Sequence, residues 1–304
     1  MYHSGTQLVL GLTHIYYNKI ALINLSFKGF FYYRISAKPK NKNLLNIKIL
    51  LQLIPGRKSS LKNEIKKMDG KILLISDMHG RNPTNLIKQF LDDGIEEVVF
   101  LGDYDTPEVL RDLRKLKIKK KFIIGNHDYH FVCKIGKLSS QIMRRSSEEY
   151  FKLWEDNLEE KTFVIDAIKN RKKEAGLVLE ERLGKKKVVY CHGGIVNKFS
   201  PHPQIPGYFW QRMFIGEKEN REVIEENLAS MVEKRYWIMF RGHDHIPIVI
   251  KSKRNSKEIE YIYEENISLE RDKIHIATIG PFYSGYFALF NPTTGIIEYK
   301  RTSL

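Results

Sequence analysis

Five short apolar runs along the chain each lead directly into a cluster of histidine, aspartate or asparagine residues. The runs have the length and residue types of buried β-strands, and they are Lys71–Ser76, Glu97–Leu101, Lys121–Ile124, Lys187–Cys191 and Tyr236–Phe240. The clusters that follow are Asp77-Met78-His79-Gly80, Gly102-Asp103-Tyr104-Asp105, Gly125-Asn126-His127-Asp128, Cys191-His192-Gly193-Gly194 and Gly242-His243-Asp244-His245. Because ligands of α/β sheets bind beyond the carboxyl ends of the strands, all five clusters can converge on one place.

Helical segments separate the early runs, which is the pattern of an α/β domain. The pairs Asn82-Pro83 and Thr106-Pro107 each predict the start of a helix. Two longer segments also read as helical, residues 141–176 and 217–235. The first of them is expected to form a cap inserted over the domain. Later apolar runs at closer spacing predict a second, more antiparallel sheet, and they are Ile246–Lys251, Ile259–Glu264, Lys273–Thr278 and Tyr286–Asn291.

The basic charge of the chain is concentrated towards its N-terminus. Residues 1–67 hold twelve lysines and arginines and a single acid, Glu64, so +11 of the net charge of +15 lies there. The remaining residues, 68–304, carry only +4, which is unremarkable for a catalytic domain. We therefore expect two parts, a basic, aromatic-rich leader over residues 1–67 and a catalytic domain over residues 68–304.

The leader places aromatic clusters such as Phe30-Phe31-Tyr32-Tyr33 between lysines, and no helical or strand period is sustained in it. Three interpretations stay open: upstream sequence before a true start at Met68, an arm that contacts a membrane surface, or a packed extension. Its longest apolar stretch is shorter than the roughly 20 residues that span a bilayer. Two cysteines and no secretory pattern predict a cytoplasmic protein with reduced thiols.

A single histidine or aspartate at the end of a strand most often caps a turn or makes an ordinary hydrogen bond. Five such clusters at the same place in five strands favour a shared metal site instead. Of the ten histidines, His79, His127, His192, His243 and His245 lie in the clusters, whereas His3, His14, His130, His202 and His275 do not. Imidazole, carboxylate and amide ligands suit manganese, iron, zinc, cobalt or nickel, so Cys191 is expected to lie behind the ligands or in the core.

In this order the clusters resemble the calcineurin-like metallophosphoesterase superfamily, whose pattern is D-x-H, G-D, G-N-H, a lone His and G-H-x-H. The resemblance covers roughly residues 70–300. It implies an α/β fold, a four-layer αββα sandwich of two mixed β-sheets flanked by helices, with a helical cap insertion. It also implies two divalent transition metal ions, one held by Asp77, His79, Asp103 and His245 and the other by Asp103, Asn126, His192 and His243. Asp103 bridges the two.

The same resemblance implies a hydrolase that cleaves phosphoric ester bonds by metal-activated hydroxide, with manganese the favoured metal. His127 is expected to be the general acid, because a histidine with a pKa of about 6.5 can protonate a leaving alkoxide at neutral pH. Either Asp105 or Asp128 is expected to orient it. The other interpretation of Asp128 is a cap of the turn or helix that follows.

The class of phosphoester is less constrained. Phosphoprotein phosphatases carry G-D-x-V-D-R-G, whereas residues 102–107 read G-D-Y-D-T-P, without the arginine. The tail from Ile279 to Gly295 looks more like the small bacterial and archaeal phosphodiesterases of the superfamily. We therefore favour a small phosphodiesterase or phosphatase. A serine/threonine protein phosphatase-like enzyme, a nuclease and a non-catalytic binding module are the alternatives.

Residues beside the clusters indicate how a substrate is held. Arg81 and Arg241 are adjacent to motifs and are the candidate phosphate-binding residues. Aromatic residues of segments 150–154 and 208–210 can stack on a nucleobase, which adds nucleotides to the expected phosphoester partners, although such residues more often belong to a core. The modest charge of residues 68–304 gives no strong nucleic-acid signal, and membrane contact by the leader is a weak expectation.

Overall fold

The chain divides into two compact units, Met1–Lys66 and Lys67–Leu304. The computed structural model describes residues 15–17, 20–27, 31–41, 44–49, 70–133, 141–200, 206–254, 256 and 258–303, with side chains described from residue 70 onward except at 141–147. The candidate start Met68 and the histidines His3, His14 and His202 lie outside the described residues. Among the described helices, none combines the length and the apolar character needed to cross a membrane.

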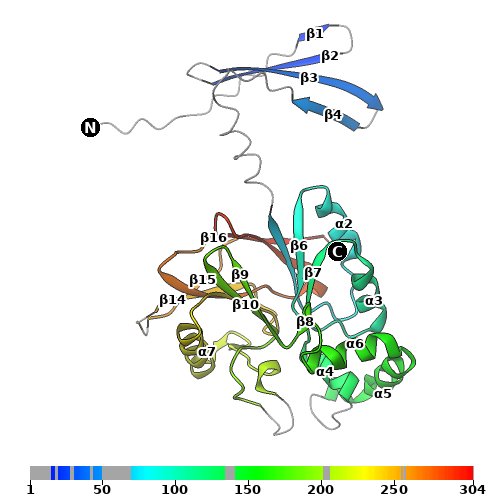
Figure 1. Cartoon of the computed structure of the whole chain (residues 1–304), viewed down its shortest axis with the longest axis vertical. Helices are drawn as coiled ribbons and strands as arrows, with labels where there is room; N and C mark the ends of the chain where they lie inside the picture. Colours follow the sequence, from blue (N-terminus) through cyan, green and yellow to red (C-terminus); the bar gives the residue numbers. More distant parts are fainter. Residues whose placement is uncertain are drawn as a thin grey trace. The chain divides into compact units, whose positions relative to one another are not determined.

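The first unit contains a four-stranded antiparallel sheet. Its strands follow one another in chain order, β1 (Ile15–Tyr17), β2 (Ile20–Phe27), β3 (Phe31–Asn41) and β4 (Leu44–Ile49) (Figure 1). No sustained strand period predicts these strands from the sequence. Pairing between neighbouring strands stabilises such a sheet, and a test for alternating apolar residues along one strand does not detect it.

The second unit is built on two mixed sheets. The first has seven strands, in the order β16 (Asn266–Ser268), β19 (Ile296–Arg301), β18 (Tyr286–Asn291), β5 (Lys71–Ile75), β6 (Ile95–Phe100), β7 (Lys119–Ile123) and β8 (Ala175–Gly176). Strands β5 to β8 are parallel, whereas β18 is antiparallel to β5 and β19 is antiparallel to β18 and β16.

The second sheet has six strands, in the order β15 (Glu260–Ile262), β14 (Ile248–Lys253), β17 (Lys273–Thr278), β13 (Tyr236–Arg241), β10 (Lys186–Cys191) and β9 (Val178–Leu183). Its centre, β10, β13 and β17, is parallel, and its other pairings are antiparallel. A separate hairpin joins β11 (Phe214–Ile215) to β12 (Lys218–Glu219).

The expected strands are present, but their distribution between the sheets differs from the prediction. The five strands that precede the clusters are divided, because β5, β6 and β7 belong to the first sheet and β10 and β13 to the second. The run Tyr286–Asn291 was expected in the second sheet, yet it pairs with β5 of the first. Apolar periodicity identifies a strand without naming its neighbour, which packing of the whole domain decides.

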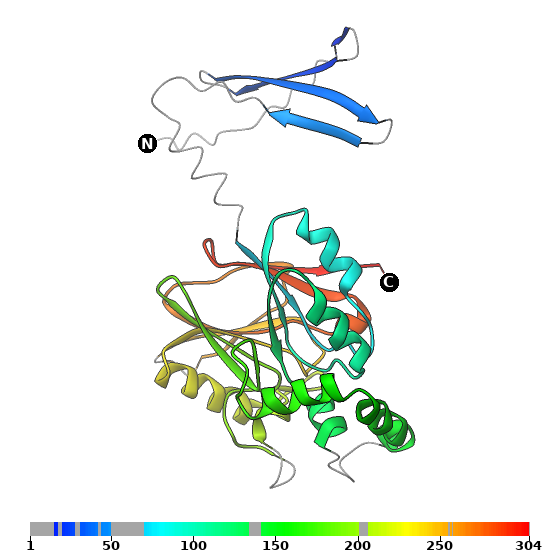
Figure 2. The same cartoon turned by 45° about the vertical axis from the view of Figure 1, so that its right-hand side comes forward.

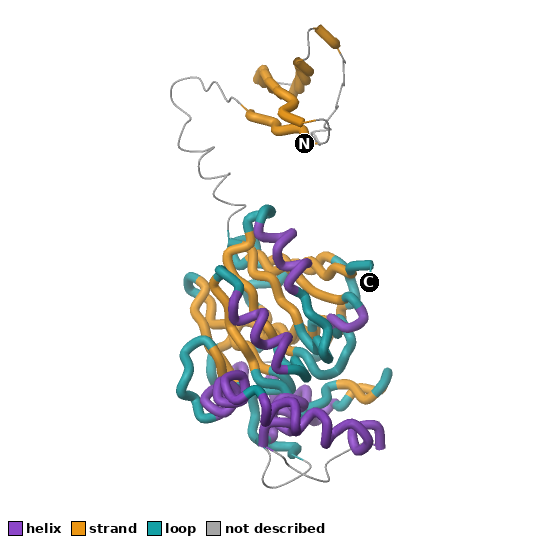
Figure 3. The backbone as a smooth tube through the Cα atoms, turned by 90° about the vertical axis from the view of Figure 1, so that its right-hand side faces the viewer, coloured by secondary structure: helices purple, strands orange, loops and turns teal. Residues whose placement is uncertain are grey.

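Six helices are described: α2 (Thr84–Leu91), α3 (Pro107–Lys115), α4 (Asn126–Cys133), α5 (Gln141–Asp156), α6 (Leu158–Ile168) and α7 (Arg221–Glu233). Apolar residues of α2, α3 and α6 pack on one face of the first sheet, and those of α7 pack on the outer face of the second. A third apolar cluster fills the space between the two sheets. Figure 2 shows α2 and α3 on one side of the strands and the yellow helix α7 on the other, and in Figure 3 helices cross in front of the strands. The expected four-layer αββα sandwich is confirmed.

Helix α3 begins where the sequence predicts, and α2 begins one residue later. Thr106 caps α3, with its side chain accepting from the Val109 amide and Pro107 at the first helical position. Helix α2 begins at Thr84, one residue later than expected, and Asn82 accepts from the Thr84 amide at 3.0 Å. The Asn82 side chain therefore orders the turn that enters α2.

The segment expected to form a helical insertion contains α5 and α6, which lie between β7 and β8 in the chain. It is not one helix, because it breaks at Asn157 and ends at Ile168, before β8. Helix α5 packs against α4, and α6 packs against both α3 and α4. This insertion therefore lies beside the helix that starts at Asn126.

Candidate metal centre

The carboxyl ends of β5, β6, β7, β10 and β13 meet, and backbone hydrogen bonds fasten their loops together. The Asp77 amide donates to Gly102 O at 3.1 Å, and the His79 amide donates to Asp103 O at 2.9 Å. The Gly242 amide donates to His192 O at 3.1 Å, which joins the two loops of the second sheet. The predicted clusters thus form one site, at the edge where both sheets end.

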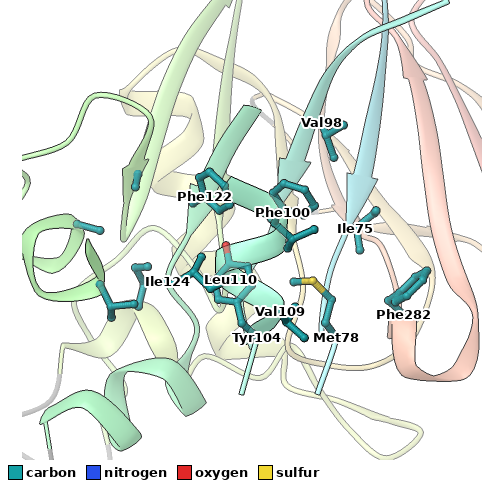
Figure 4. Packing of buried hydrophobic residues seen from close by; sticks show 14 of the residues in the cluster. Ile75, Met78, Val98, Phe100, Tyr104, Val109, Leu110, Phe122, Ile124 and Phe282 are labelled. Carbon is teal, nitrogen blue, oxygen red and sulfur yellow. The ribbon is translucent and has the colours of Figure 1, made fainter. Parts of the chain in front are cut away.

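An apolar residue between two polar ones anchors each of the first two loops. Met78 lies between Asp77 and His79, and its side chain is fully buried in the core beside α3. Tyr104 follows Asp103 and is equally buried, with its hydroxyl donating to Ile123 O at 2.9 Å. Figure 4 shows Met78 and Tyr104 in this core. With these side chains held in the core, the flanking polar ones face the site.

The backbone of the site is strained. Nine non-glycine residues in the described part have positive φ, and six of them are Asp77, His79, Asp103, Asp105, His243 and His245. A non-glycine residue in this region costs about 1–3 kcal/mol, and such residues gather at functional sites. Glycine is required next to them: a Cβ on Gly242 would lie 1.8 Å from Ser76 Oγ. The strain is offset by packing elsewhere and aims the side chains into one space.

One group of candidate ligands combines Asp77, His79 and His245. The Nε2 atom of His245 lies 3.3 Å from Asp77 Oδ1 and 3.3 Å from His79 Nε2. All three ligand atoms lie within 4.8 Å of one another. Two imidazole nitrogens at this distance repel when both carry lone pairs, so a cation or a proton between them is needed.

A second group combines Asp103, His192 and His243, all buried. His192 Nε2 lies 3.3 Å from Asp103 Oδ2 and 2.9 Å from Asn126 Oδ1. His192 Nδ1 lies 2.7 Å from Leu101 O. That carbonyl takes the Nδ1–H, while Nε2 faces two acceptor oxygens. Burial lowers the pKa of His192, but the Asp103 carboxylate outweighs it and raises the pKa to about 9, so Nε2 carries a proton here. A cation bound between these atoms would replace that proton and take the Nε2 lone pair.

Asp103 lies between the two groups. Its Oδ2 atom is 3.3 Å from His192 Nε2 in the second group and 3.9 Å from His79 Nε2 in the first. Its other oxygen, Oδ1, accepts from the His127 amide at 3.0 Å, which fixes the carboxylate plane. This is the placement that a bridging carboxylate requires.

His243 gives the sharpest test of whether these residues fit a metal ion. It is 1% exposed, and its Nε2 atom is buried without a hydrogen-bond partner among the described residues. Burial and the nearby His192 hold the pKa of His243 well below its usual range, so the ring stays neutral. A buried orphaned nitrogen is costly unless something binds it. Beside Asp103 and His192, a divalent cation fits.

Asp105 holds two histidines with one carboxylate. Its Oδ1 lies 3.0 Å from His127 Nδ1, and its Oδ2 lies 3.1 Å from His79 Nδ1. His127 Nε2 therefore faces the site, 4.0 Å from Asp103 Oδ2. Burial lowers the pKa of His127, but the Asp103 charge and the bond to Asp105 outweigh it and raise the pKa to about 10. A cation bound at Asp103 would oppose that rise.

Asp128 does not contact His127 through its carboxylate, so the structure favours the capping interpretation of this residue. Its Oδ2 accepts from the Asp103 and Gly125 amides, each at 2.9 Å. Its Oδ1 accepts from the Tyr104 amide at 2.9 Å and the Asp105 amide at 3.3 Å. Of the two candidates, Asp105 orients His127, and Asp128 shapes the loop that carries Asp103.

The two predicted phosphate-binding arginines differ in placement. Arg241 is fully buried, and its five N–H groups are occupied by Gly193 O, Gln211 O, Thr278 Oγ1 and both oxygens of Asp244. With no donor left, the prediction that Arg241 binds substrate is wrong; it braces the loops behind the site. Arg81 is half-buried at the rim, where one Nη donates to Tyr283 O at 3.1 Å, and it keeps free donors.

Two residues touch the site in ways that the sequence did not predict. Trp154 was one of the aromatic residues that could stack on a base or, more often, belong to a core; it is fully buried, and its indole N–H donates to Asp105 O at 2.9 Å. Tyr283 was not singled out, and its hydroxyl lies 3.4 Å from His245 Nδ1. Both reach the site from outside the motifs, so no local pattern could have identified them. Cys191 is buried, which raises the pKa of its thiol to about 12 and disfavours a ligand thiolate.

Comparison with known proteins gives a family model and similar solved structures. The family model of the calcineurin-like phosphoesterase superfamily domain matches residues 71–263. A metallophosphoesterase from Sphaerobacter thermophilus is similar in structure, with a TM-score of 0.51 and 21% identity, over 77% of this chain and 88% of that one. A hypothetical protein from Pyrococcus horikoshii OT3 gives a TM-score of 0.53 and 15% identity over the same shares. These two structures support the fold alone, and no curated protein matches the sequence.

Proposed function

Because the chain belongs to the calcineurin-like phosphoesterase superfamily, we propose that it is a binuclear metal-dependent phosphoesterase with His127 as its general acid. The observation that carries this proposal is the meeting of two ligand groups at Asp103, whose Oδ2 lies within 4 Å of a histidine nitrogen from each group. Two adjacent groups joined by a shared carboxylate are what a two-metal site needs.

Residues of the two groups would hold the metal ions. Asp77, His79 and His245 supply one group, and Asn126, His192 and His243 supply the other, with Asp103 between them. Bound divalent cations would lower the pKa of a water molecule and neutralise charge on the phosphoryl oxygens. The mixed nitrogen and oxygen donor set favours manganese, with iron, zinc, cobalt and nickel as alternatives.

The proposed acid step belongs to His127. Its Nδ1–H is held by Asp105, so Nε2 faces the ligand groups and carries the proton that the leaving oxygen receives. The carboxylates of Asp103 and Asp105 favour the protonated ring. Proton donation of this kind contributes about 10²- to 10⁴-fold to a rate, mostly for poor leaving groups.

The proposed substrate is a small phosphomonoester or phosphodiester. Arg81 and the exposed Arg212, which donates to His243 O at 2.9 Å, are placed to bind phosphoryl oxygens. Among the candidate stacking residues, Trp154 and Phe209 are buried in the core. A base can stack only on partly exposed rings such as those of Tyr150 and Trp210. A protein phosphatase-like activity is the second candidate, and a nuclease or a binding module is weaker.

A substrate panel tests the proposal. The full chain, stripped with chelator and reloaded with Mn²⁺, would be assayed on an aryl monoester, an aryl diester, a cyclic nucleotide, a dinucleotide polyphosphate and a phosphopeptide. We expect turnover of a small ester that chelation abolishes and Mn²⁺ restores. Undiminished turnover after complete metal removal, or no turnover of any ester by protein with two bound metal ions, would refute it.

Residues 1–67 are proposed to be dispensable for catalysis in a cytoplasmic enzyme, because every candidate ligand lies in residues 70–304. The shortened chain of residues 68–304 should fold and keep the kcat and KM of the full chain on the same ester. A soluble, folded but inactive shortened chain would contradict this proposal and assign the leader a part in the site.

A further inference from the structure

The inserted helix α5 reaches the site through one side chain. Trp154 is fully buried and ranks among the largest fully buried side chains of the described part. Its indole N–H donates to the backbone carbonyl of Asp105 at 2.9 Å, a contact between residues 49 positions apart. A buried N–H paired with a carbonyl is a directional bond, so the indole fixes the carbonyl as well as filling space.

The residue that Trp154 holds is conformationally demanding. Asp105 has φ of 64°, a left-handed conformation that an aspartate adopts only where its surroundings impose it. Its amide donates to Asp128 Oδ1 at 3.3 Å, and its carbonyl accepts from Trp154. The peptide groups on both sides of its Cα are thereby held, which fixes the direction of the Cα–Cβ bond that carries the carboxylate.

The direction of the Asp105 carboxylate affects two histidines. One oxygen of Asp105 lies 3.0 Å from His127 Nδ1, and the other lies 3.1 Å from His79 Nδ1. A rotation of Asp105 that shortens one bond must lengthen or bend the other, because a carboxylate is planar and rigid. The rings of His79 and His127 are also in edge contact, with centroids 4.7 Å apart.

We propose that Trp154 is a positioning residue: from the inserted helix it holds Asp105, so that a single carboxylate orients the metal ligand His79 and the proton donor His127 together. The inference rests on the proposed function for the role of His127, but the link from Trp154 to His79 concerns metal binding and stands without it. It assigns to the insertion a part in the chemistry besides packing on α4.

A purely structural role is the competing explanation, since Trp154 also belongs to the core cluster beneath α3. Trp154→Phe keeps most of the ring and removes the N–H. Trp237→Phe is the matched control, because its indole is 4% exposed and donates to Glu270 O at 3.1 Å. Trp237 lies near the start of β13, whereas the site lies beyond the end of that strand.

The experiment compares the full-length wild type, Trp154→Phe and Trp237→Phe. Urea unfolding places the two variants on one stability scale. Mn²⁺ affinity and stoichiometry are measured by calorimetry, and kcat and KM are measured on two aryl phosphoesters, one with a good and one with a poor leaving group.

We expect Trp154→Phe to weaken Mn²⁺ binding at one site and to lower kcat on the poor leaving group, each by about 10-fold. The loss on the good leaving group should be smaller and KM little changed, because substrate contacts are intact. Trp237→Phe should match the wild type in Mn²⁺ affinity, kcat and KM, while its free energy of unfolding falls about as much as that of Trp154→Phe.

The proposal is overturned if Trp154→Phe binds Mn²⁺ like the wild type, or if both tryptophan variants lose affinity alike. The part of the proposal that concerns His127 is overturned if Trp154→Phe lowers kcat equally on the two esters. A wild type that hydrolyses no ester would refute the proposed function instead, and the Mn²⁺ affinities would still decide whether Trp154 acts on His79.

Discussion

Two buried histidines of this protein have similar exposure and lowered pKa values but different surroundings. His243 and His275 are each 1% exposed, and each has a ring nitrogen without a well-formed hydrogen bond among the described residues. Burial lowers the pKa of both, to about 4 for His275 and well below the usual range for His243. His243 faces Asp103 and His192, whereas His275 lies in β17 against the ring of Trp237.

Burial and an orphaned nitrogen therefore do not by themselves make a metal site. His243 has the left-handed backbone of a strained loop, at φ of 73°, and other ligand atoms within reach. His275 occupies a regular strand between Lys251 and Ile238 of the neighbouring strands. A ring nitrogen of His275 without a well-formed hydrogen bond is a cost that packing offsets, whereas His243 Nε2 is available to a cation.

Replacing each of the two histidines by alanine should have very different consequences. His243→Ala should lose one of two bound metal ions and slow phosphoester hydrolysis by about 10³-fold, because several kcal/mol of charge stabilisation depends on each ion. His275→Ala is the matched control and should keep both ions and the wild-type rate. Elemental analysis beside kcat on one aryl ester decides it. Equal metal content in the two variants would mean that His243 is an ordinary buried histidine.

A second prediction concerns Asp128, whose buried carboxylate accepts hydrogen bonds from four backbone amides, whereas His243 Nε2 has no partner among the described residues. Asp128→Asn replaces one acceptor oxygen by an NH₂ group that faces amide donors, so it should reduce the free energy of unfolding by about 3 kcal/mol. Asp166→Asn, at a half-buried residue 3.6 Å from Arg171, should cost less than about 1 kcal/mol. Urea unfolding of both variants measures the contrast. Equal losses would show that the four amides do not need the carboxylate.

The third prediction tests whether His127, which lies in the site, binds a metal ion. His127 lies among the ligands, yet His127→Ala should keep both metal ions. Its rate on an ester with a poor leaving group should fall by about 10²-fold, and by less with a good leaving group. His192→Ala, which removes a candidate ligand, is the comparison variant and should lower metal content and both rates together. Loss of an ion from His127→Ala would make it a ligand and end its assignment as the acid.

The smallest effect belongs to His275 and follows from its lowered pKa. The unfolded chain binds a proton at this residue below about pH 6.5, whereas the folded protein does so only near pH 4. The free energy of unfolding from this group therefore falls as the pH falls between those values, by about 1 kcal/mol from roughly pH 7.5 to 5.5. His275→Leu should remove that part of the pH dependence. An unchanged pH profile in the variant would show that His275 titrates normally.

Much of the site could be predicted from the sequence. The residues Asp77, His79, Asp103, His192, His243 and His245 were singled out because a polar cluster follows each apolar run, and the structure brings all of them together. The αββα sandwich followed from the same motifs through a family resemblance. The candidate ligands are predictable because a strand and the loop after it are adjacent in the chain.

The tertiary structure decided which partner each side chain meets. Asp105 and Asp128 are equally plausible partners of His127 in the sequence, and only the folded loop gives one to the ring and the other to four amides. Arg241 resembles a phosphate ligand until its five donors are seen to be occupied. Trp154 reaches Asp105 across 49 residues. The local sequence therefore predicts which chemical groups the site holds, whereas the directions of those groups depend on contacts between distant segments, which no local pattern encodes.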